Sequence, residues 1–141
     1  MCIFCKIIKK EIPCVKIWED KDFLAILDIN PNTKGMTLVM PKKHYESYAF
    51  NMEDKVYSDF LLAAKKVGKI LEKGLSTRIA MVMEGTGVDH AHIKLYPIHG
   101  LKGESSKRIF FDEYPGYITT QLGPEANIEE LKKLGKKIYE S

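Results

Sequence analysis

Polar and apolar side chains alternate without a break over residues 90–96. A period of two is the repeat of a β-strand, and it places successive side chains on opposite faces of a sheet. The apolar side chains of this segment are therefore predicted to face a core, while His90, His92 and Lys94 share the other face. Such a face is a candidate binding surface, although an exposed sheet face without any function is a common alternative.

The remaining patterns predict an α+β domain with an antiparallel sheet. The predicted strands cover residues 15–18, 23–27, 37–40 and 78–83; the first two form a hairpin, and the last is apolar enough for a central strand buried on both faces. A helical turn is expected over residues 3–9. A long amphipathic helix is predicted to start at an Asn51 cap and to stop at Gly74, and a final helix begins at Asn127.

Length and charge set limits on the class of protein. A chain of 141 residues fits one domain, here taken as residues 1–141. A net charge of +3, from 22 basic and 19 acidic side chains, does not indicate extended nucleic-acid binding. No apolar run approaches the length of a membrane span, and the N-terminal apolar stretch is too short for a signal peptide. We therefore expect a cytoplasmic protein with no membrane partner.

Cys2 and Cys5 form a C-x-x-C pair, with Cys14 as a third cysteine. In a reducing compartment this spacing indicates metal or redox chemistry more than a structural disulfide. The alternative is two reduced cysteines in an N-terminal turn. Cys14 is interpreted as a small core or surface residue.

Several motifs in the right order together resemble the histidine-triad (HIT) family. Residues 88–96 are similar to its His-φ-His-φ-His-φ-φ signature, in which φ is an apolar residue. Residues 2–13 are similar to its N-terminal segment. Residues 27–31 and 35–44 are similar to its ribose loop and the strand that follows. The resemblance covers about residues 1–97 and leaves residues 98–141 as a divergent extension. It implies a HIT-like antiparallel sheet with one long helix and a C-terminal helix. It also implies a homodimer.

The resemblance implies that His92 is the nucleophile that attacks the α-phosphate of a nucleotide or nucleotide conjugate. A neutral imidazole suits this role because it attacks phosphorus without first losing a proton. A nucleotidyl-histidine intermediate would then be hydrolysed or passed to another acceptor. Lys94 is expected to bind the phosphate as an electrophile.

The nucleotide-binding residues also follow from the resemblance. Asp28 falls where the family holds the ribose hydroxyls, and a carboxylate can accept hydrogen bonds from both, although a turn aspartate is the alternative. Thr86 is expected near the phosphate, where a plain glycine-containing turn fits equally well. The positions that enclose the base are Ile3, Phe4, Ile7 and Ile26, which are otherwise simply core residues.

The resemblance further implies a zinc site, as in a zinc-containing bacterial and archaeal branch of the family. The expected ligands are Cys2, Cys5, His44 and His90. Four protein ligands complete a tetrahedron, so the zinc would be structural and not catalytic.

Two positions depart from the family pattern. Lys94 stands where the third histidine is expected, and Met36 replaces another frequent histidine. Two alternatives therefore stay open: a nucleotide-binding regulatory module that no longer turns over, and a zinc-stapled interaction protein without a ligand. Residues 99–122 form a long polar and aromatic connection. Its part from Lys107 to Leu122 has no counterpart in the family, and could cover the site, join a dimer interface or pack on its own core.

Overall fold

A tight acidic turn folds the first two strands into a hairpin. Asp20 Oδ1 accepts hydrogen bonds from the backbone N–H groups of Asp22, at 2.8 Å, and Phe23, at 2.7 Å. This Asx turn joins β1 (Lys16–Glu19) to β2 (Phe23–Leu27), which pair antiparallel. The predicted hairpin is confirmed.

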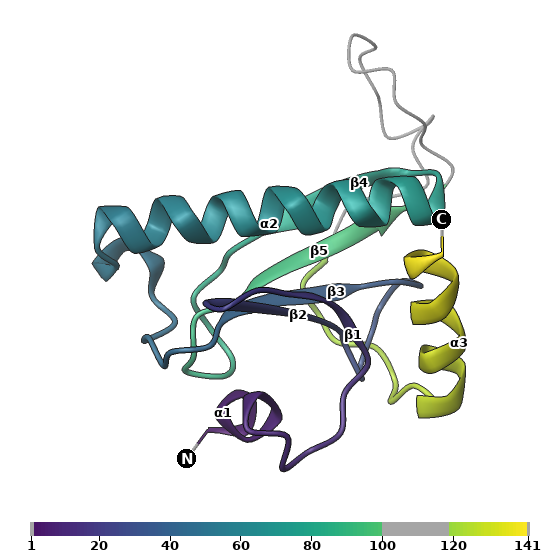
Figure 1. Cartoon of the computed structure of the whole chain (residues 1–141), viewed down its shortest axis with the longest axis horizontal. Coiled ribbons are helices and arrows are strands. Elements are labelled where there is room, and N and C mark those ends of the chain that lie inside the picture. The colour runs from purple at the N-terminus through teal and green to yellow at the C-terminus, as the bar shows by residue number, and fades with distance from the viewer. Residues whose placement is uncertain (1, 100–118, 141) are drawn as a thin grey trace, which may run out of the picture.

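In the described residues, the sheet is antiparallel and contains five strands in the order β1-β2-β3-β5-β4 (Figure 1). The structure is a computed structural model, and it describes residues 2–99 and 119–140. The other strands are β3 (Thr37–Pro41), β4 (Arg78–Val82) and β5 (Ile93–Ile98); the helices are α1 (Ile3–Ile8), the short 3-10 helix η1 (Ala49–Asn51), α2 (Asp54–Leu75) and α3 (Ile128–Tyr139). The predicted α+β fold is confirmed. No helix of the described residues is both long and apolar enough to cross a bilayer.

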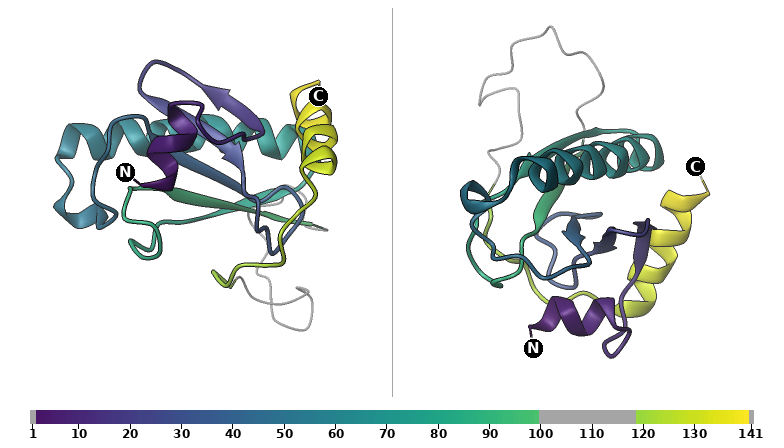
Figure 2. Two further views of the ribbon diagram at one scale, coloured as in Figure 1. Left: turned by 90° about the horizontal axis from the view of Figure 1, so that it is seen from below. Right: turned by 60° about the vertical axis from the view of Figure 1, so that its left-hand side comes forward.

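Helices cover both faces of the sheet (Figures 1 and 2). On one face α2 buries Phe60, Val67 and Leu71 against the core residues of β3 and β5. On the other face α1 places Phe4 over apolar side chains of β2 and β3. Each large apolar side chain that leaves water in this way contributes about 1.5–3 kcal/mol. The sheet is therefore held between two apolar layers.

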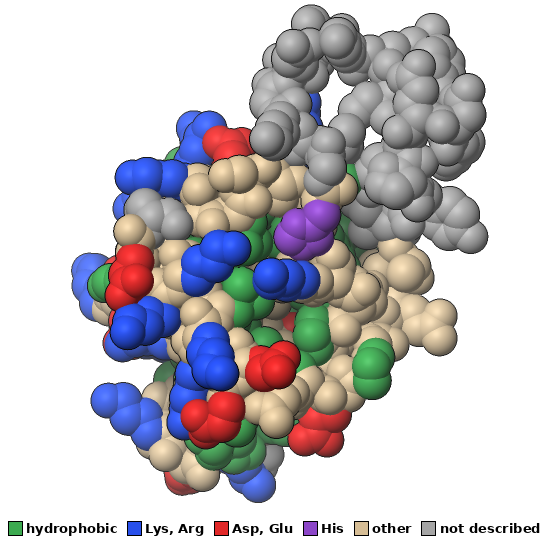
Figure 3. Space-filling model, turned by 90° about the vertical axis from the view of Figure 1, so that its right-hand side faces the viewer, with side chains coloured by type: hydrophobic (Ala, Val, Ile, Leu, Met, Phe, Trp, Pro, Cys, Tyr) green, Lys and Arg blue, Asp and Glu red, His purple; other side chains and the backbone are tan. Residues whose placement is uncertain are grey.

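The third helix, α3, packs across one end of the sheet, next to β1 and α2. Figure 3 shows this end of the molecule, where lysine and acidic side chains lie interspersed. Lys132 pairs with Glu129 at 3.3 Å, and Lys136 with Glu140 at 4.0 Å. Asn127 caps the helix as predicted, because its Oδ1 accepts from the backbone of residues 129 and 130.

The ends of α2 differ from the prediction. Asn51 closes η1 instead of capping α2, and its side chain donates to Glu46 at 2.6 Å. Glu53 is the N-cap residue. Gly74 lies inside the helix, which ends at Leu75 and has Ser76 as its C-cap residue, in a left-handed conformation with φ 52°. Instead, Gly74 allows α2 and α3 to pack closely, because a Cβ at this position would lie 2.9 Å from the Ile138 Cα on α3.

The position of β4 also corrects the prediction. It is an edge strand that pairs with β5, not a central one, and Met81 on it is 53% exposed. The next strand starts later than its alternating pattern indicates, because the Ala91 N–H donates to the Tyr45 carbonyl outside the sheet. Even so, Ala91 packs in the α2-side core, while Lys94 faces the opposite side.

Candidate functional site

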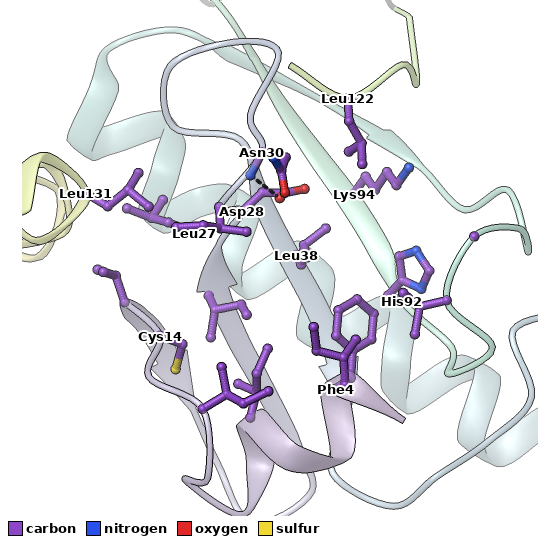
Figure 4. A pocket seen from close by; sticks show the side chains of 18 of the residues that line it. Phe4, Cys14, Leu27, Asp28, Asn30, Leu38, His92, Lys94, Leu122 and Leu131 are labelled. Carbon is purple, nitrogen blue, oxygen red and sulfur yellow. Dashed lines mark hydrogen bonds between the residues drawn. The ribbon is translucent and has the colours of Figure 1, made fainter. Parts of the chain in front are cut away.

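A cavity of about 300 Å³ lies on the α1 side of the sheet (Figure 4). Its walls come from α1, β2, β3, β5, the loop before β5 and the segment that leads into α3. The lining includes every residue predicted for catalysis or nucleotide binding: His92, Lys94, Asp28, Ile3, Phe4, Ile7, Ile26 and Thr86. The fold thus brings these residues, distant in the sequence, to one place.

His92 borders the cavity just before β5 begins. Its Nδ1 lies 2.8 Å from the carbonyl oxygen of His90. A carbonyl only accepts, so Nδ1 carries the proton and Nε2 keeps its lone pair. The Phe4 ring meets the imidazole edge-on at 5.1 Å between centroids. The arrangement fixes one tautomer of the ring in one orientation.

Burial lowers the pKa of His92 below its usual value. The Lys94 ammonium lowers this pKa further, whereas the hydrogen bond to the His90 carbonyl and the carboxylates of Glu84 and Asp28 act in the opposite direction. The net shift is downward, so the imidazole is neutral at pH 7. A neutral, oriented ring with a free Nε2 has the form of a nucleophile.

Lys94 follows on the same face of β5, and its side chain is nearly buried. Its Nζ donates to Glu84 Oε1 at 2.5 Å. This bond is the main cause that lowers the pKa of Glu84, and hydrogen bonds from Thr120 and Thr86 act in the same direction. Sequence reasoning did not assign a role to Glu84. The ammonium beside His92 is therefore held by a carboxylate.

Asp28 follows the end of β2 and lies across the cavity from His92 and Lys94 (Figure 4). Its Oδ1 accepts from the Asn30 N–H at 2.8 Å, which is the turn interaction that the sequence allowed. The same carboxylate is buried, with 6% of the residue exposed, and it lines the cavity. The turn and the candidate ribose site are thus compatible.

The segment before α3 supplies a wall of the cavity, which is one of the alternatives that the sequence left open for it. Asn32 Nδ2 donates to the carbonyls of Thr119, at 2.7 Å, and Gln121, at 2.8 Å, and the Gly123 N–H donates to the Asn30 carbonyl at 3.1 Å. These bonds place Leu122 at the cavity, next to Lys94 (Figure 4).

Part of the polar and aromatic connection lies outside the described residues, namely residues 100–118 with their aromatic side chains. His99, at the edge of the described part, donates from Nε2 to the Lys34 carbonyl at 2.8 Å and does not line the cavity. Met36 is fully buried and is also absent from the lining. It gives the site no polar group.

Four potential metal ligands meet beside the cavity. They are Cys2, Cys5, His44 and His90, and their ligand atoms all lie within 4.8 Å of one another. The distances from each Sγ to each Nδ1 are 3.4–3.6 Å. A tetrahedral zinc with bonds of about 2.3 Å to sulfur and about 2.0 Å to nitrogen separates such atoms by about 3.6 Å. The donor set therefore fits zinc in both chemistry and spacing.

His90 connects this cluster to the cavity. Its Nε2 donates to the Pro41 carbonyl at 2.8 Å, which directs Nδ1 at the two sulfurs. Its backbone carbonyl is the group that orients His92. The same residue thus supports both sites.

Comparison with known proteins agrees with this geometry. The HIT domain family model matches residues 9–99. An uncharacterized HIT-like protein of Methanocaldococcus jannaschii is 41% identical over 116 residues, which cover 76% of this chain and 86% of the relative. An adenosine 5′-monophosphoramidase of Saccharomyces cerevisiae is 35% identical over 143 residues, covering 97% of this chain and 80% of the relative.

Solved structures extend the likeness to the fold. The crystal structure of a hypothetical histidine triad nucleotide-binding protein from Sulfolobus tokodaii strain7 superposes with a TM-score of 0.77 at 27% identity. The match covers 99% of this chain and 90% of that one. The likeness therefore extends past the family-model match to the described residues 119–140.

Proposed function

This chain belongs to the HIT domain family, and on that premise we propose that it is a nucleotide hydrolase or nucleotidyltransferase that acts at the α-phosphate through His92. The observation that carries the proposal is the neutral His92 imidazole, which lines a cavity together with Lys94 and Asp28. The apolar part of the cavity would enclose the base, and Asp28 would accept hydrogen bonds from the ribose hydroxyls.

In the proposed reaction, the lone pair on His92 Nε2 attacks phosphorus. A P–N bond forms while the bond to the leaving group breaks, and the leaving group departs with the electron pair and takes up a proton. The positive charge that the ring acquires is stabilised by the hydrogen bond from Nδ1 to the His90 carbonyl. Lys94, in place of the third histidine, donates to a phosphoryl oxygen. Water or another acceptor then breaks the P–N bond and regenerates the imidazole.

The name of the yeast relative supports one substrate class, a nucleoside monophosphate joined to an amine. Leu122 beside Lys94 is compatible with such a leaving group, because an apolar side chain does not repel an uncharged amine. We therefore take adenosine 5′-phosphoramidate as the first substrate to test.

The test is a single turnover with this substrate labelled at the α-phosphorus, quenched in denaturant at alkaline pH to preserve a phosphorus–nitrogen bond. We expect label on the wild-type protein and none on His92→Asn. Glu72→Gln, on the exposed face of α2, is the control and should retain the label. Substrate that binds to the wild type without label or product would favour the regulatory module, and no binding would favour the interaction protein.

We infer that Cys2, Cys5, His44 and His90 hold a structural zinc. The support is their spacing, and four protein ligands leave no open position for substrate. Metal analysis of protein purified without chelator should give one equivalent of zinc, and Cys5→Ala should lower this strongly, whereas Cys14→Ala should not. Much less than one equivalent in the wild type, with Cys2 and Cys5 freely alkylated, would contradict the site.

We also infer a homodimer. The edge strand β4 offers backbone groups for pairing, and the exposed apolar side chains Met81 and Leu62 lie on β4 and α2. A second copy of the chain would cover them.

A further inference from the structure

The ion pair between Lys94 and Glu84 decides the charge at the reacting end of the cavity. Among the described residues that line the cavity, Lys94 is the only lysine or arginine. Its ammonium is bound to Glu84 Oε1 at 2.5 Å, with only 11% of the lysine side chain and 25% of the glutamate side chain exposed. A pair shielded to this degree from water is screened less than a surface pair.

The pair lies beside the reacting group. Lys94 lines the same cavity as His92, and its Nζ is 2.5 Å from Glu84 Oε1. Hydrogen bonds from Lys94, Thr120 and Thr86 lower the pKa of Glu84, so its carboxylate is ionised at pH 8. A phosphate at His92 would therefore meet one positive and one negative charge of the pair, whose sum is zero.

We propose that Glu84 is a specificity-determining residue that selects substrates whose reacting phosphate carries a single negative charge. This inference rests on the proposed function. A phosphoramidate or phosphodiester carries one negative charge, whereas the nucleoside monophosphate product carries close to two at pH 8, since its second pKa is about 6. A free lysine would hold the dianionic product more tightly than the substrate. By neutralising Lys94, Glu84 removes this preference and eases product release.

The size of the effect follows from Coulomb's law. The dianion and the monoanion differ by one unit of charge, which interacts with the Glu84 carboxylate behind Lys94, 2.5 Å from the Lys94 Nζ. At an effective dielectric constant between the protein value and that of water, removing the Glu84 charge should favour the dianion over the monoanion by about tenfold.

The experiment compares two ligands that share base and ribose, AMP and its 5′-O-methyl phosphodiester, by calorimetry at pH 8. Glu84→Gln keeps an oxygen that accepts from Lys94 but removes the charge. We expect its ratio of affinities, AMP over methyl ester, to rise about tenfold above that of the wild type. Lys94→Gln leaves the Glu84 charge unbalanced and should lower the same ratio. Glu72→Gln makes the same charge change on an exposed part of α2 and should leave the ratio unchanged.

The outcomes separate this inference from the proposed function. Binding of both ligands by all variants with an unchanged ratio contradicts the role of Glu84 and leaves the proposed function intact. Failure of the wild type to bind either ligand contradicts both. Thermal unfolding verifies that each variant is folded. If Glu84→Gln does not fold, Lys94→Gln provides the test, because an unchanged ratio of affinities in that variant also overturns the inference.

Discussion

Tyr96 carries a buried polar group. Its residue is 2% exposed, and among residues 2–99 and 119–140 its hydroxyl has no hydrogen-bond partner. A buried polar group without a partner costs about 1–3 kcal/mol. Tyr96→Phe removes the hydroxyl and keeps the ring, so we expect the free energy of unfolding in urea at pH 7 to rise by about 1 kcal/mol. A decrease would mean that the hydroxyl binds a water or another group in solution.

The same tyrosine predicts a pH dependence. Burial, followed by the charges of Glu84 and Asp28, raises the pKa of Tyr96 to about 12, whereas an unfolded tyrosine titrates near ~10. Between these values the unfolded chain loses a proton that the folded chain keeps, so stability falls as pH rises from about 10 to 12, by about 2–3 kcal/mol in all.

Urea unfolding at pH 9 and above measures this loss. Other groups titrate in the same range, so the comparison is with Tyr96→Phe, which should decline less steeply than the wild type. Parallel declines would show that the pKa of Tyr96 is not raised by folding.

Asp28 gives a prediction about ligand choice. As the proposed ribose anchor, it should make the protein bind AMP more tightly than 2′,3′-dideoxy-AMP by about tenfold or more, because hydrogen bonds to a charged group contribute about 1.5–3 kcal/mol. Asp28→Asn retains an oxygen for the Asn30 N–H and should lose most of this discrimination. Asp59→Asn, on α2, is the control. If Asp28→Asn discriminates between AMP and 2′,3′-dideoxy-AMP as strongly as the wild type does, Asp28 stabilises its turn and does not bind the ribose.

The limits of sequence analysis are clearest for Glu84 and Leu122. His92, Lys94 and Asp28 were singled out because a family resemblance points to their positions; the structure gathers them at one cavity, and their roles stay predictions. Glu84 meets Lys94 only because the β4–β5 register pairs Val82 with Lys94. Leu122 lies at the cavity because the adjacent Gln121 accepts a hydrogen bond from Asn32, 89 positions earlier in the chain. Neither contact has a local pattern in the sequence.

At the scale of elements, the two glycines of α2 provide a matched pair. A Cβ on Gly74 would lie 2.9 Å from the Ile138 Cα and 3.1 Å from its carbonyl oxygen, whereas a Cβ on Gly68 would meet nothing within 4 Å. Backbone atoms of α3 cannot move aside as a flexible side chain can.

We expect Gly74→Ala to lower the free energy of unfolding by about 1–2 kcal/mol, because the overpacking against α3 outweighs the gain in helix propensity. Gly68→Ala should instead raise it by about 0.5–1 kcal/mol. Urea denaturation of both variants checks the signs. Stabilisation by both would show that α3 does not pack against α2 as described.

The elements themselves were largely predictable, since the apolar repeats that define them are local. The errors arise where distant contacts decide. Gly74 was taken for a helix stop on local preference, whereas its role is set by Ile138. The apolar content of β4 predicted a central strand, but strand order places it at the edge. An edge strand can carry the same apolar run as a central strand when another chain covers its apolar side chains.

At the scale of the whole molecule, the edge strand therefore leads to a prediction about assembly. Met81 is 53% exposed on β4, and Leu62 is 57% exposed on α2. Large apolar side chains at the edge of a sheet favour association with a second copy. We expect the wild type to be a dimer by light scattering at micromolar concentration.

Met81→Glu would place a charge in this interface, where it must lose its water without a partner, at a cost of several kcal/mol per dimer. The variant should therefore be a monomer with an unchanged far-ultraviolet spectrum. Phe50→Glu is the matched control, because Phe50 is 80% exposed on η1, outside both β4 and α2, and its replacement should leave the dimer intact. A wild-type monomer, or dissociation by Phe50→Glu alone, would place the interface elsewhere or exclude it.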